Sequence, residues 1–431
     1  MTAESEIVSR LQAENQRLKR AVEELALLND LAREIGASLN SQEVMQSIIR
    51  RSLRAMNAEQ GVITLIDQQA LAPMRTLVRT RVSSGRQQAF HLEQSLQGWM
   101  LLHKMPLVIN DPAHDERFRG VTWEESIRSL VCAPLLVKSE LKGILTLYNK
   151  KDGAGFTTED QRLLGIIAAQ SAQVVENARL YEEEQALLRM QEQVRLAAQI
   201  QYELLPKTAP DIAGYEIAGK TLPAQSVGGD YFDFIPIDEQ CWALCLGDVT
   251  GKGLPASLLM ANLQATIRGQ TLSSSSVSEC LGRANRLLHQ STDDEKFASA
   301  FYTKLDTQQH LLCYANAGQN DPLLFSSSPN PLRLKTGGIM LGLFPSFPFQ
   351  EETISLQHGD LLLIYSDGVT EAKNVLDEDF GEERLIELVQ RNLEKSAGDL
   401  VEKIIAAVKA FAGAAPQHDD ITLMILRRLA A

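Results

Sequence analysis

The sequence predicts a multidomain α+β protein, and three observations support this fold class. The chain has 431 residues, which is too long for one ordinary hydrophobic core, so two or three domains are expected. Two regions, about residues 30–180 and 207–431, each combine short apolar strand-like runs with amphipathic helical stretches. Between these regions, the helical spacing of apolar residues continues without a break until Pro206.

The composition is typical of a soluble globular protein, with 44% hydrophobic and 23% charged residues. The net charge of −13 argues against nucleic acid or an anionic membrane as the main partner. No apolar run approaches the roughly 20 residues that cross a bilayer, and the N-terminus lacks a signal-peptide core. The five cysteines lie mostly among apolar neighbours and form no CxxC spacing, which predicts reduced thiols in a cytoplasmic protein.

The first segment, residues 1–29, is predicted to be a coiled-coil helix. Its apolar residues follow a heptad seam: Val8, Leu11, Leu18, Val22 and Leu25. Asn15 and Asn29 also fall at seam positions, where polar residues fix the register of a parallel coiled coil. An amphipathic helix that packs on its own domain is the alternative interpretation.

Residues 30–180 are predicted to form an antiparallel sheet covered by helices on one or both faces. A helical pattern at 44–56 comes first. The strand-like runs that follow are 61–67, 76–82, 106–110, 130–137 and 143–150. The helix that closes this unit is not expected to stop at its end.

A linker helix is predicted over residues 181–206. The apolar residues that continue a coiled-coil spacing are Leu180, Leu187, Met190, Val194, Ala197 and Leu204. Such a helix can transmit torque or a shift of register from one domain to the other. Alternatively, it serves only as a dimerising spacer. The sequence leaves both interpretations open.

Residues 207–431 are predicted to be rich in β-structure, with helices set apart from the strands. The expected strands lie at 231–237, 241–247, 298–306, 310–318, 322–327, 360–368 and 421–427. The expected helices lie at 255–270, 277–290 and 398–413. The serine-rich segments 271–278 and 325–334 are predicted to be connectors, the second of them at the end of a hairpin.

Four of these strands carry an aspartate at one end. Asp230 and Asp248 are equally distant from the turn at 238–240, so they must emerge at the same end of an antiparallel hairpin. Asp367 follows a third apolar strand, and Asp419 and Asp420 precede a fourth. The polarity of the strands allows antiparallel neighbours to gather all these carboxylates.

Such a cluster would repel itself without counter-cations. Ligands that are all oxygen suit Mg²⁺ or Mn²⁺ rather than zinc. Two ions roughly 3.5–4 Å apart, bridged by one carboxylate, would lower the pKa of a shared water and provide hydroxide at neutral pH. The glycines at 228, 229, 247 and 251 would let the backbone approach ions and phosphate closely. The alternative is a set of unrelated turns at strand ends.

Several motifs occur in a specific order: SVGGDYFDF, LGDVTGKGLPASLLM, YANAG, LLLIYSDGVTEAKN, FGEERL and DDITLMIL. They resemble the SpoIIE/RsbU branch of the metal-dependent (type 2C) protein phosphatases, and AAQIQYELLP resembles the lead-in helix of that branch. The resemblance covers about residues 195–431. It implies a β-sandwich flanked by helices, and hydrolysis of phosphoserine or phosphothreonine.

The resemblance also implies ligands for two metal ions. Asp248 corresponds to the carboxylate that bridges both ions, and the carbonyl of Val249 completes the shell of the second ion. Asp367 and Asp419 correspond to ligands of the first ion, and Asp230 to a ligand of the second ion, acting through water. No side-chain nucleophile is implied, because metal-activated hydroxide attacks phosphorus in line.

The chain departs from the family pattern at NAGQNDP, where NAGHNPP is frequent. Gln319 replaces a titratable histidine and Asp321 replaces a proline, which bears on substrate preference rather than on catalysis. Lys252 is interpreted as an exposed turn lysine, with contact to a phosphate oxygen as the alternative. His418 is interpreted as a solvated loop histidine.

Residues 25–180 resemble a GAF sensor domain, mainly through the stretch from Leu130 to Glu183. A partial match to the signature of cyclic-nucleotide-binding members is formed by Asn149, Lys150, Phe156 and Asp160. Gln161 stands where those members have glutamate, so a structural role is the preferred interpretation. Cys132 is predicted to be an inert core thiol rather than a redox or chromophore-attachment site.

The predicted order is a coiled-coil helix (1–29), a GAF sensor domain (30–180), a signalling linker helix (181–206) and a phosphatase domain (207–431). We expect a cytoplasmic, homodimeric serine/threonine phosphatase that uses two Mn²⁺ or Mg²⁺ ions and is regulated by an unidentified small molecule or protein at the GAF domain. The resemblance implies a phosphorylated STAS-type anti-anti-sigma factor as substrate, in bacterial stress or developmental signalling. The alternative is a non-catalytic GAF-based scaffold for ligand sensing or dimerisation.

Overall fold

The computed structural model describes residues 14–15, 41–66, 74–81, 94–293 and 295–429. Its internal contacts divide the chain into two compact units, residues 1–189 and 190–431. The predicted coiled-coil segment 1–29 lies, apart from two residues, outside the described part. Within that part, no helix is long and apolar enough to cross a membrane.

The first unit contains a five-stranded antiparallel sheet in the order β2-β1-β5-β4-β3. The strands are β1 (Ala58–Ile66), β2 (Met74–Arg81), β3 (Leu107–Ile109), β4 (Leu130–Val137) and β5 (Glu140–Lys150). The helices are α2 (Ser41–Ala55), α3 (Gln94–His103), a short 3-10 helix (Glu116–Phe118) and the first part of α4 (Thr158–Leu204). One apolar core packs α2 and α4 against one face of the sheet, and a second core packs α3 against the other. The predicted antiparallel sheet with flanking helices is confirmed.

The signature-like residues of this unit have structural partners. Lys150 Nζ lies 2.6 Å from Asp160 Oδ2, and Gln161 Nε2 donates to the Pro106 carbonyl at 2.6 Å. The Asn149 amide pairs with the backbone of the segment before β4. Cys132 is fully buried, and burial raises the pKa of its thiol, which fits the predicted inert core role.

Helix α4 is one continuous helix, so the helical spacing predicted to run as far as Pro206 is confirmed. The division between the two units falls inside it, after residue 189. Three apolar residues of the predicted seam, Leu180, Leu187 and Met190, are 48%, 56% and 63% exposed. Their side chains therefore remain available for contact with another molecule.

The second unit is built from two sheets. One sheet has the order β13-β10-β9-β8-β7, with β14 paired to β10, and the other has the order β12-β11-β15-β16-β6. The strands of the first sheet are β7 (Tyr231–Pro236), β8 (Cys241–Val249), β9 (Ala298–Asp306), β10 (Leu311–Ala317), β13 (Gly337–Gly338) and β14 (Glu352–Ser355). The strands of the second are β6 (Tyr215–Leu222), β11 (Leu323–Phe325), β12 (Leu332–Arg333), β15 (Leu361–Tyr365) and β16 (Ile421–Arg428).

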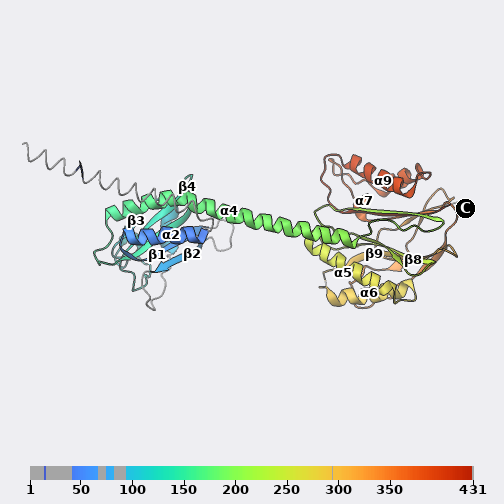
Figure 1. Ribbon diagram of the computed structural model, residues 1–431, viewed down its shortest axis with the longest axis horizontal. Helices are drawn as coiled ribbons and strands as arrows, with labels where there is room; N and C mark the ends of the chain where they lie inside the picture. The colour runs from blue at the N-terminus through green and yellow to red at the C-terminus, as the bar shows by residue number, and fades with distance from the viewer. Residues whose placement is uncertain (1–13, 16–40, 67–73, 82–93, 294, 430–431) are drawn as a thin grey trace, which may run out of the picture. The chain divides into compact units, whose positions relative to one another are not determined.

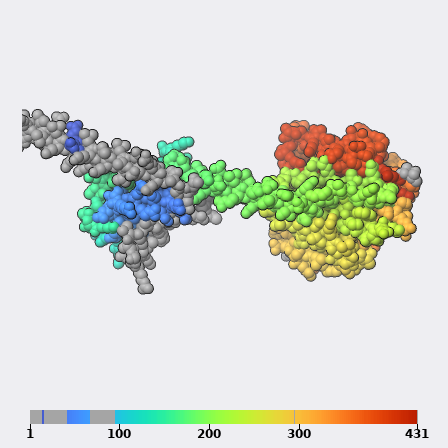
Figure 2. Space-filling view, viewed as in Figure 1, coloured from blue at the N-terminus to red at the C-terminus, as the bar shows by residue number. Residues whose placement is uncertain are grey.

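Helices cover the outer faces of both sheets, as Figures 1 and 2 show for α9 on one side and α5 and α6 on the other. Helices α5 (Leu254–Thr271) and α6 (Val277–Ser291) pack on the first sheet, and α8 (Glu382–Gln390) and α9 (Ala397–Ala412) on the second. The short helix α7 (Asp367–Thr370) follows β15. Alternate residues of β15 divide between the cores, because Leu362 and Ile364 face the sandwich interior while Leu361 and Leu363 face α8 and α9. The predicted β-sandwich flanked by helices is confirmed.

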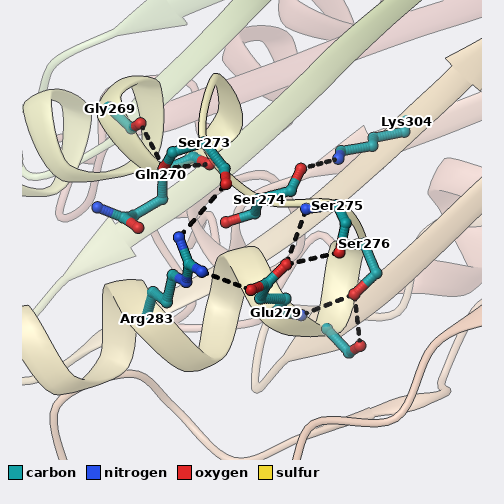
Figure 3. A network of polar contacts seen from close by, with 10 residues as sticks. Gly269, Gln270, Ser273, Ser274, Ser275, Ser276, Glu279, Arg283 and Lys304 are labelled. Atoms are coloured by element: carbon teal, nitrogen blue, oxygen red, sulfur yellow. Dashed lines mark hydrogen bonds and ion pairs between the residues drawn. The ribbon is translucent and has the colours of Figure 1, made fainter.

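The serine-rich connector between α5 and α6 is held by a polar network (Figure 3). Ser276 caps α6 by accepting a hydrogen bond from the Glu279 N–H at 3.1 Å. The Glu279 carboxylate accepts in turn from the Ser275 N–H at 2.8 Å and from Arg283 at 2.6 Å. Lys304 of β9 donates to the Ser274 carbonyl at 3.0 Å. These bonds satisfy free N–H groups at the start of α6 and tie the turn to the sheet beneath it.

Candidate metal centre

Asp230 and Asp248 face each other at one end of the β7–β8 hairpin. The strand register pairs Tyr231 with Gly247, so the residues one step further out are Asp230 and Asp248. The two carboxyls are close enough for the charge of Asp248 to raise the pKa of Asp230. The prediction that both carboxylates emerge at the same end of the hairpin is therefore confirmed.

Asp367 and Asp419 come from the second sheet. Tyr365 of β15 pairs with Leu423 of β16, so Asp367, just after β15, and Asp419, two residues before β16, leave this sheet at the same end. Their charges act on each other and on Asp248, because both raise the pKa of the Asp248 carboxyl. The structure thus brings together the four predicted aspartates from the β7–β8 hairpin of one sheet and the β15–β16 strand pair of the other.

The β7–β8 hairpin and the β15–β16 strand pair are joined by Asp420, which the sequence analysis placed near the cluster without giving it a role. Asp420 Oδ2 accepts hydrogen bonds from the N–H groups of Gly229 at 2.6 Å and Asp230 at 3.2 Å, and Oδ1 accepts from Ala224 at 2.8 Å. A Cβ atom on Gly228 would lie 2.3 Å from Asp420 Oδ2, so a side chain there would expel the carboxylate. Asp420 therefore holds the loop that carries Asp230.

The last turn of α4 holds the same loop through Gln201, which is 7% exposed. Gln201 Nε2 donates to the Gly228 carbonyl at 2.6 Å, and Gln201 Oε1 accepts from the Gly228 N–H at 3.0 Å. Gln264 of α5 donates to the Leu204 carbonyl at 3.3 Å and anchors the end of the helix. The lead-in helix is therefore in direct contact with the loop that presents Asp230.

Burial and mutual repulsion raise the pKa values of the clustered carboxyls. Burial, followed by the charge of Asp248, raises the pKa of Asp230 well above its ordinary value. Burial, followed by the charges of Asp367 and Asp419, raises the pKa of Asp248 to about 7. The pKa of Asp367 is raised mainly by burial and then by Asp419. In the metal-free chain, the cluster therefore favours partial protonation near neutral pH.

Lys252 lies beside this cluster and contacts it directly. Its Nζ lies 2.9 Å from Asp419 Oδ2 and donates to the His418 carbonyl at 2.6 Å. Among the described residues that line the cleft with Asp248, Lys252 is the only cation. The side chain is half exposed, as predicted for a turn lysine, but it is paired with a proposed ligand rather than free. His418 is exposed, in agreement with its predicted place in a solvated loop.

The oxygen atoms of the cluster fit a hard divalent cation. Asp230 Oδ2 is buried and accepts no hydrogen bond from any described residue. A Cβ atom on Gly229 would lie 3.2 Å from the Val249 carbonyl oxygen and 3.3 Å from Asp248 Oδ1, so these two oxygens face the same glycine-lined space. All the donors are carboxylate or carbonyl oxygens, the set that Mg²⁺ and Mn²⁺ prefer.

The carboxylates do not form a finished coordination sphere. Across the part of the chain that the structure describes, no group of three acidic, histidine or cysteine side chains lies close enough together to hold an ion. Asp419 turns toward Lys252, and Asp230 and Asp248 face each other. The residues are gathered at one place, but the described side chains do not converge on a single position for an ion.

Gln319, which stands where the family pattern has histidine, is buried beneath the site rather than exposed in the cleft. Its Nε2 donates to the Tyr365 carbonyl at 3.2 Å, and its Oε1 accepts from the hydroxyl of Ser299, the residue paired with Asp248. Gln319 therefore links β9 of the first sheet to β15 of the second sheet, behind the aspartates. Asp321 lies 3.6 Å from Lys335 in an ion pair.

Comparison with known proteins agrees with this architecture. Residues 238–429 match the family of Stage II sporulation protein E (SpoIIE), and residues 38–176 match the GAF domain family. Phosphoserine phosphatase RsbU of Bacillus subtilis is 29% identical over 254 residues, which cover 58% of this chain and 75% of RsbU. Phosphoserine phosphatase RsbP of Bacillus subtilis is 24% identical over 201 residues, 46% of this chain and 48% of RsbP.

A solved structure supports the fold of the second unit. The SiaA-PP2C domain of Pseudomonas aeruginosa superimposes with a TM-score of 0.50 at 20% identity, and the match covers 56% of this chain and 98% of that domain. The chain spans three quarters of RsbU but less than half of RsbP. The motifs, the two-sheet sandwich and these matches lead to one conclusion: the chain joins a GAF domain to a SpoIIE-type phosphatase domain of the PP2C fold.

Proposed function

We propose that this protein removes phosphate from phosphoserine or phosphothreonine of a protein substrate, in a reaction that depends on two Mn²⁺ or Mg²⁺ ions. The observation that carries the proposal is that four aspartates leave two different sheets at one place, beside a glycine-lined cleft that Asp248 and Asp419 line. RsbU and RsbP, which share this domain, are phosphoserine phosphatases by name. Phosphatases of this family depend on Mn²⁺ or Mg²⁺.

In this proposal the ligands are Asp230, Asp248, Asp367 and Asp419, together with the carbonyl oxygen of Val249. When bound, the ions supply Lewis-acid activation of a water molecule and of the phosphoryl oxygens. Asp248 would be the ligand shared by both ions, since it lies opposite Asp230 in its own hairpin and is acted on by the charge of Asp367 from the other sheet. Asp420 and Gln201 position the loop before β7, which carries Asp230.

The high pKa values of the cluster support a cation-binding role. Buried carboxylates that repel one another are costly to keep ionised, and divalent cations remove that cost. The glycines at 228 and 229 keep the floor of the cleft free of side chains. No side-chain nucleophile is required in this mechanism.

We propose a phosphorylated STAS-type anti-anti-sigma factor as the class of substrate, as the resemblance to the SpoIIE/RsbU branch implies; the match to phosphoserine phosphatase RsbU covers 75% of that protein. We propose further that a small molecule or protein bound by the GAF domain changes the packing of α4. The exposed apolar residues Leu180, Leu187 and Met190 suit a parallel contact with α4 of a second copy, which would make the protein a homodimer. The contact between Gln201 and Gly228 would pass the change to Asp230.

The test is phosphate release by the full-length protein during an Mn²⁺ titration, from p-nitrophenyl phosphate and from a serine-phosphorylated STAS-domain protein. Wild type should release phosphate from both, and Asp248→Asn should lose at least about a thousandfold in rate, equivalent to about 4 kcal/mol. Asp238→Asn, at the opposite end of the same hairpin, is the matched control and should retain activity. Absence of phosphate release at every Mn²⁺ concentration would favour the non-catalytic scaffold instead.

A further inference from the structure

A hollow of about 250 Å³ opens beside the metal centre in the second unit. The start of α7 and the residues that follow it form one side, and the C-terminal end of α9 and the loop to β16 form the other. Asp419 lines both this hollow and the cleft that contains Asp248 and Lys252. The hollow and the metal centre therefore share a wall, and a bound polypeptide can reach both.

The walls of the hollow are mainly apolar. Its aliphatic surface comes from Ala372, Val408, Ala412, Pro416 and Ile421. The charged residues that also line it are Lys373, Lys409, Glu371 and Asp419. Lys373 is already paired with Asp377 at 2.9 Å. Lys409 lies on the exposed side of the last turn of α9. The hollow therefore offers apolar contacts inside, with a cation at its edge.

The size of the hollow limits what it can hold. Sites for cofactors and drug-sized ligands enclose roughly 300–1,000 Å³, so a volume of about 250 Å³ suits one large side chain better than a whole ligand. A phosphoprotein substrate must lie across the surface with its phosphoserine over the aspartates. Successive residues of an extended chain advance by about 3.3–3.6 Å, so a neighbour of the phosphoserine lies within reach of the shared wall.

We propose that this hollow is a specificity pocket that binds a large aliphatic or aromatic side chain of the substrate within three residues of the phosphoserine. Lys409, at the edge of the hollow, favours an acidic substrate residue next to that side chain, because the two charges are complementary. The inference rests on the proposed phosphatase function and adds the substrate feature that the enzyme selects. Burying one leucine side chain is sufficient for about a tenfold or greater preference in kcat/KM.

The test uses the full-length protein with Mn²⁺ and a set of glycine-rich phosphoserine peptides. A single leucine is moved from three residues before the phosphoserine to three residues after it, with alanine as the reference. Wild type should prefer leucine about tenfold at one position. Ala412→Trp and, three residues further along the same wall, Ala415→Phe should remove this preference while leaving hydrolysis of p-nitrophenyl phosphate within twofold of wild type. Ala406→Trp, on the exposed side of α9 and outside the hollow, is the matched control and should keep the preference.

The outcomes separate the two proposals. A leucine preference that survives both filling substitutions, or no preference at any position, overturns the specificity pocket while phosphatase activity stands. Failure to hydrolyse either p-nitrophenyl phosphate or any peptide contradicts the phosphatase function itself, and the pocket proposal falls with it. If Ala412→Trp does not fold, Ala415→Phe decides. A second peptide series, with an aspartate beside the leucine, tests the Lys409 edge: wild type should gain from the aspartate, and the charge reversal Lys409→Glu should abolish that gain.

Discussion

Gln201 and Gly228 form a two-point contact between the lead-in helix and the loop of the metal centre. The Gln201 side-chain amide donates to the Gly228 carbonyl at 2.6 Å and accepts from the Gly228 N–H at 3.0 Å. Gly228 lies two residues before Asp230, and both partners are buried. One side chain of α4 therefore satisfies both polar backbone groups of a residue at the base of the cleft.

Replacing Gln201 by alanine should loosen the Asp230 loop. The substitution leaves a buried N–H and a buried carbonyl without partners, at about 1–3 kcal/mol for each group. We expect the Mn²⁺ concentration for half-maximal phosphatase activity to rise about tenfold, as measured by metal titration with p-nitrophenyl phosphate. Gln199→Ala, exposed on the same helix, is the control. An unchanged metal requirement in Gln201→Ala would refute a positioning role for this contact.

The neighbours Asp419 and Asp420 should give opposite phenotypes. Asp420 is buried and accepts three backbone hydrogen bonds, so Asp420→Ala should cost about 3 kcal/mol of unfolding free energy and lower the melting temperature by several degrees. The Asp419 side chain is 41% exposed, so Asp419→Ala should leave the melting temperature almost unchanged while abolishing activity. Thermal denaturation and phosphate release, measured on both variants, check the contrast. Equal loss of stability in the two variants would contradict it.

Lys252 should compete with the metal for Asp419. In the metal-free chain its ammonium group lies 2.9 Å from the carboxylate, and half-exposed pairs of this kind are worth roughly 0.2–1 kcal/mol. Lys252→Met should therefore tighten Mn²⁺ binding about two- to fivefold in calorimetric titration, and Lys252→Arg should not. Weaker metal binding by Lys252→Met would show that the lysine supports the site instead.

Stability of the metal-free protein should fall as the pH rises. Folding raises the pKa of Asp248 from 3.8 to about 7 and also raises those of Asp230 and Asp367, so the folded state binds more protons than the unfolded state in this range. The stabilising effect is complete below the unfolded value and is lost as the pH rises through the folded one. In EDTA, we expect the melting temperature of the phosphatase domain to decrease between about pH 4 and pH 7.

Mn²⁺ should reverse this trend near neutral pH, because the cation stabilises the ionised carboxylates. Asp248→Asn removes one of the titrating groups and should flatten the pH dependence in EDTA. The measurement is thermal denaturation of wild type and variant at several pH values, with EDTA and with Mn²⁺. A metal-free stability that increases toward pH 7 would contradict the raised pKa values.

Local patterns in the sequence were sufficient for much of the fold and for the approach of the aspartates. The strand expected at 298–306 coincides with β9, and the turn at 238–240 places Asp230 opposite Asp248 because antiparallel register follows from distance along the chain. Strand β6 was missed because it is an edge strand, largely half-buried, with Gly219 and Lys220 in its interior, so it has no clear alternation. Helix α8 was also missed, since its nine residues are too few for a convincing helical period.

Tertiary structure alone decided how the site is supported. Asp420 is hydrogen-bonded to Gly229, 191 positions away in the sequence, and Gln201 to Gly228, 27 positions away. No periodic pattern in the sequence predicts either hydrogen bond. The Lys252 ion pair depends on loops from two separate sheets, and the hollow behind Asp419 depends on how the end of α9 packs beside the segment after β15. Apolar periodicity reports which face of an element is buried, whereas the identity of a distant polar partner is set by how whole layers pack. For this reason the chemistry of the cleft could be inferred from the sequence, but its positioning residues and its neighbouring pocket could not.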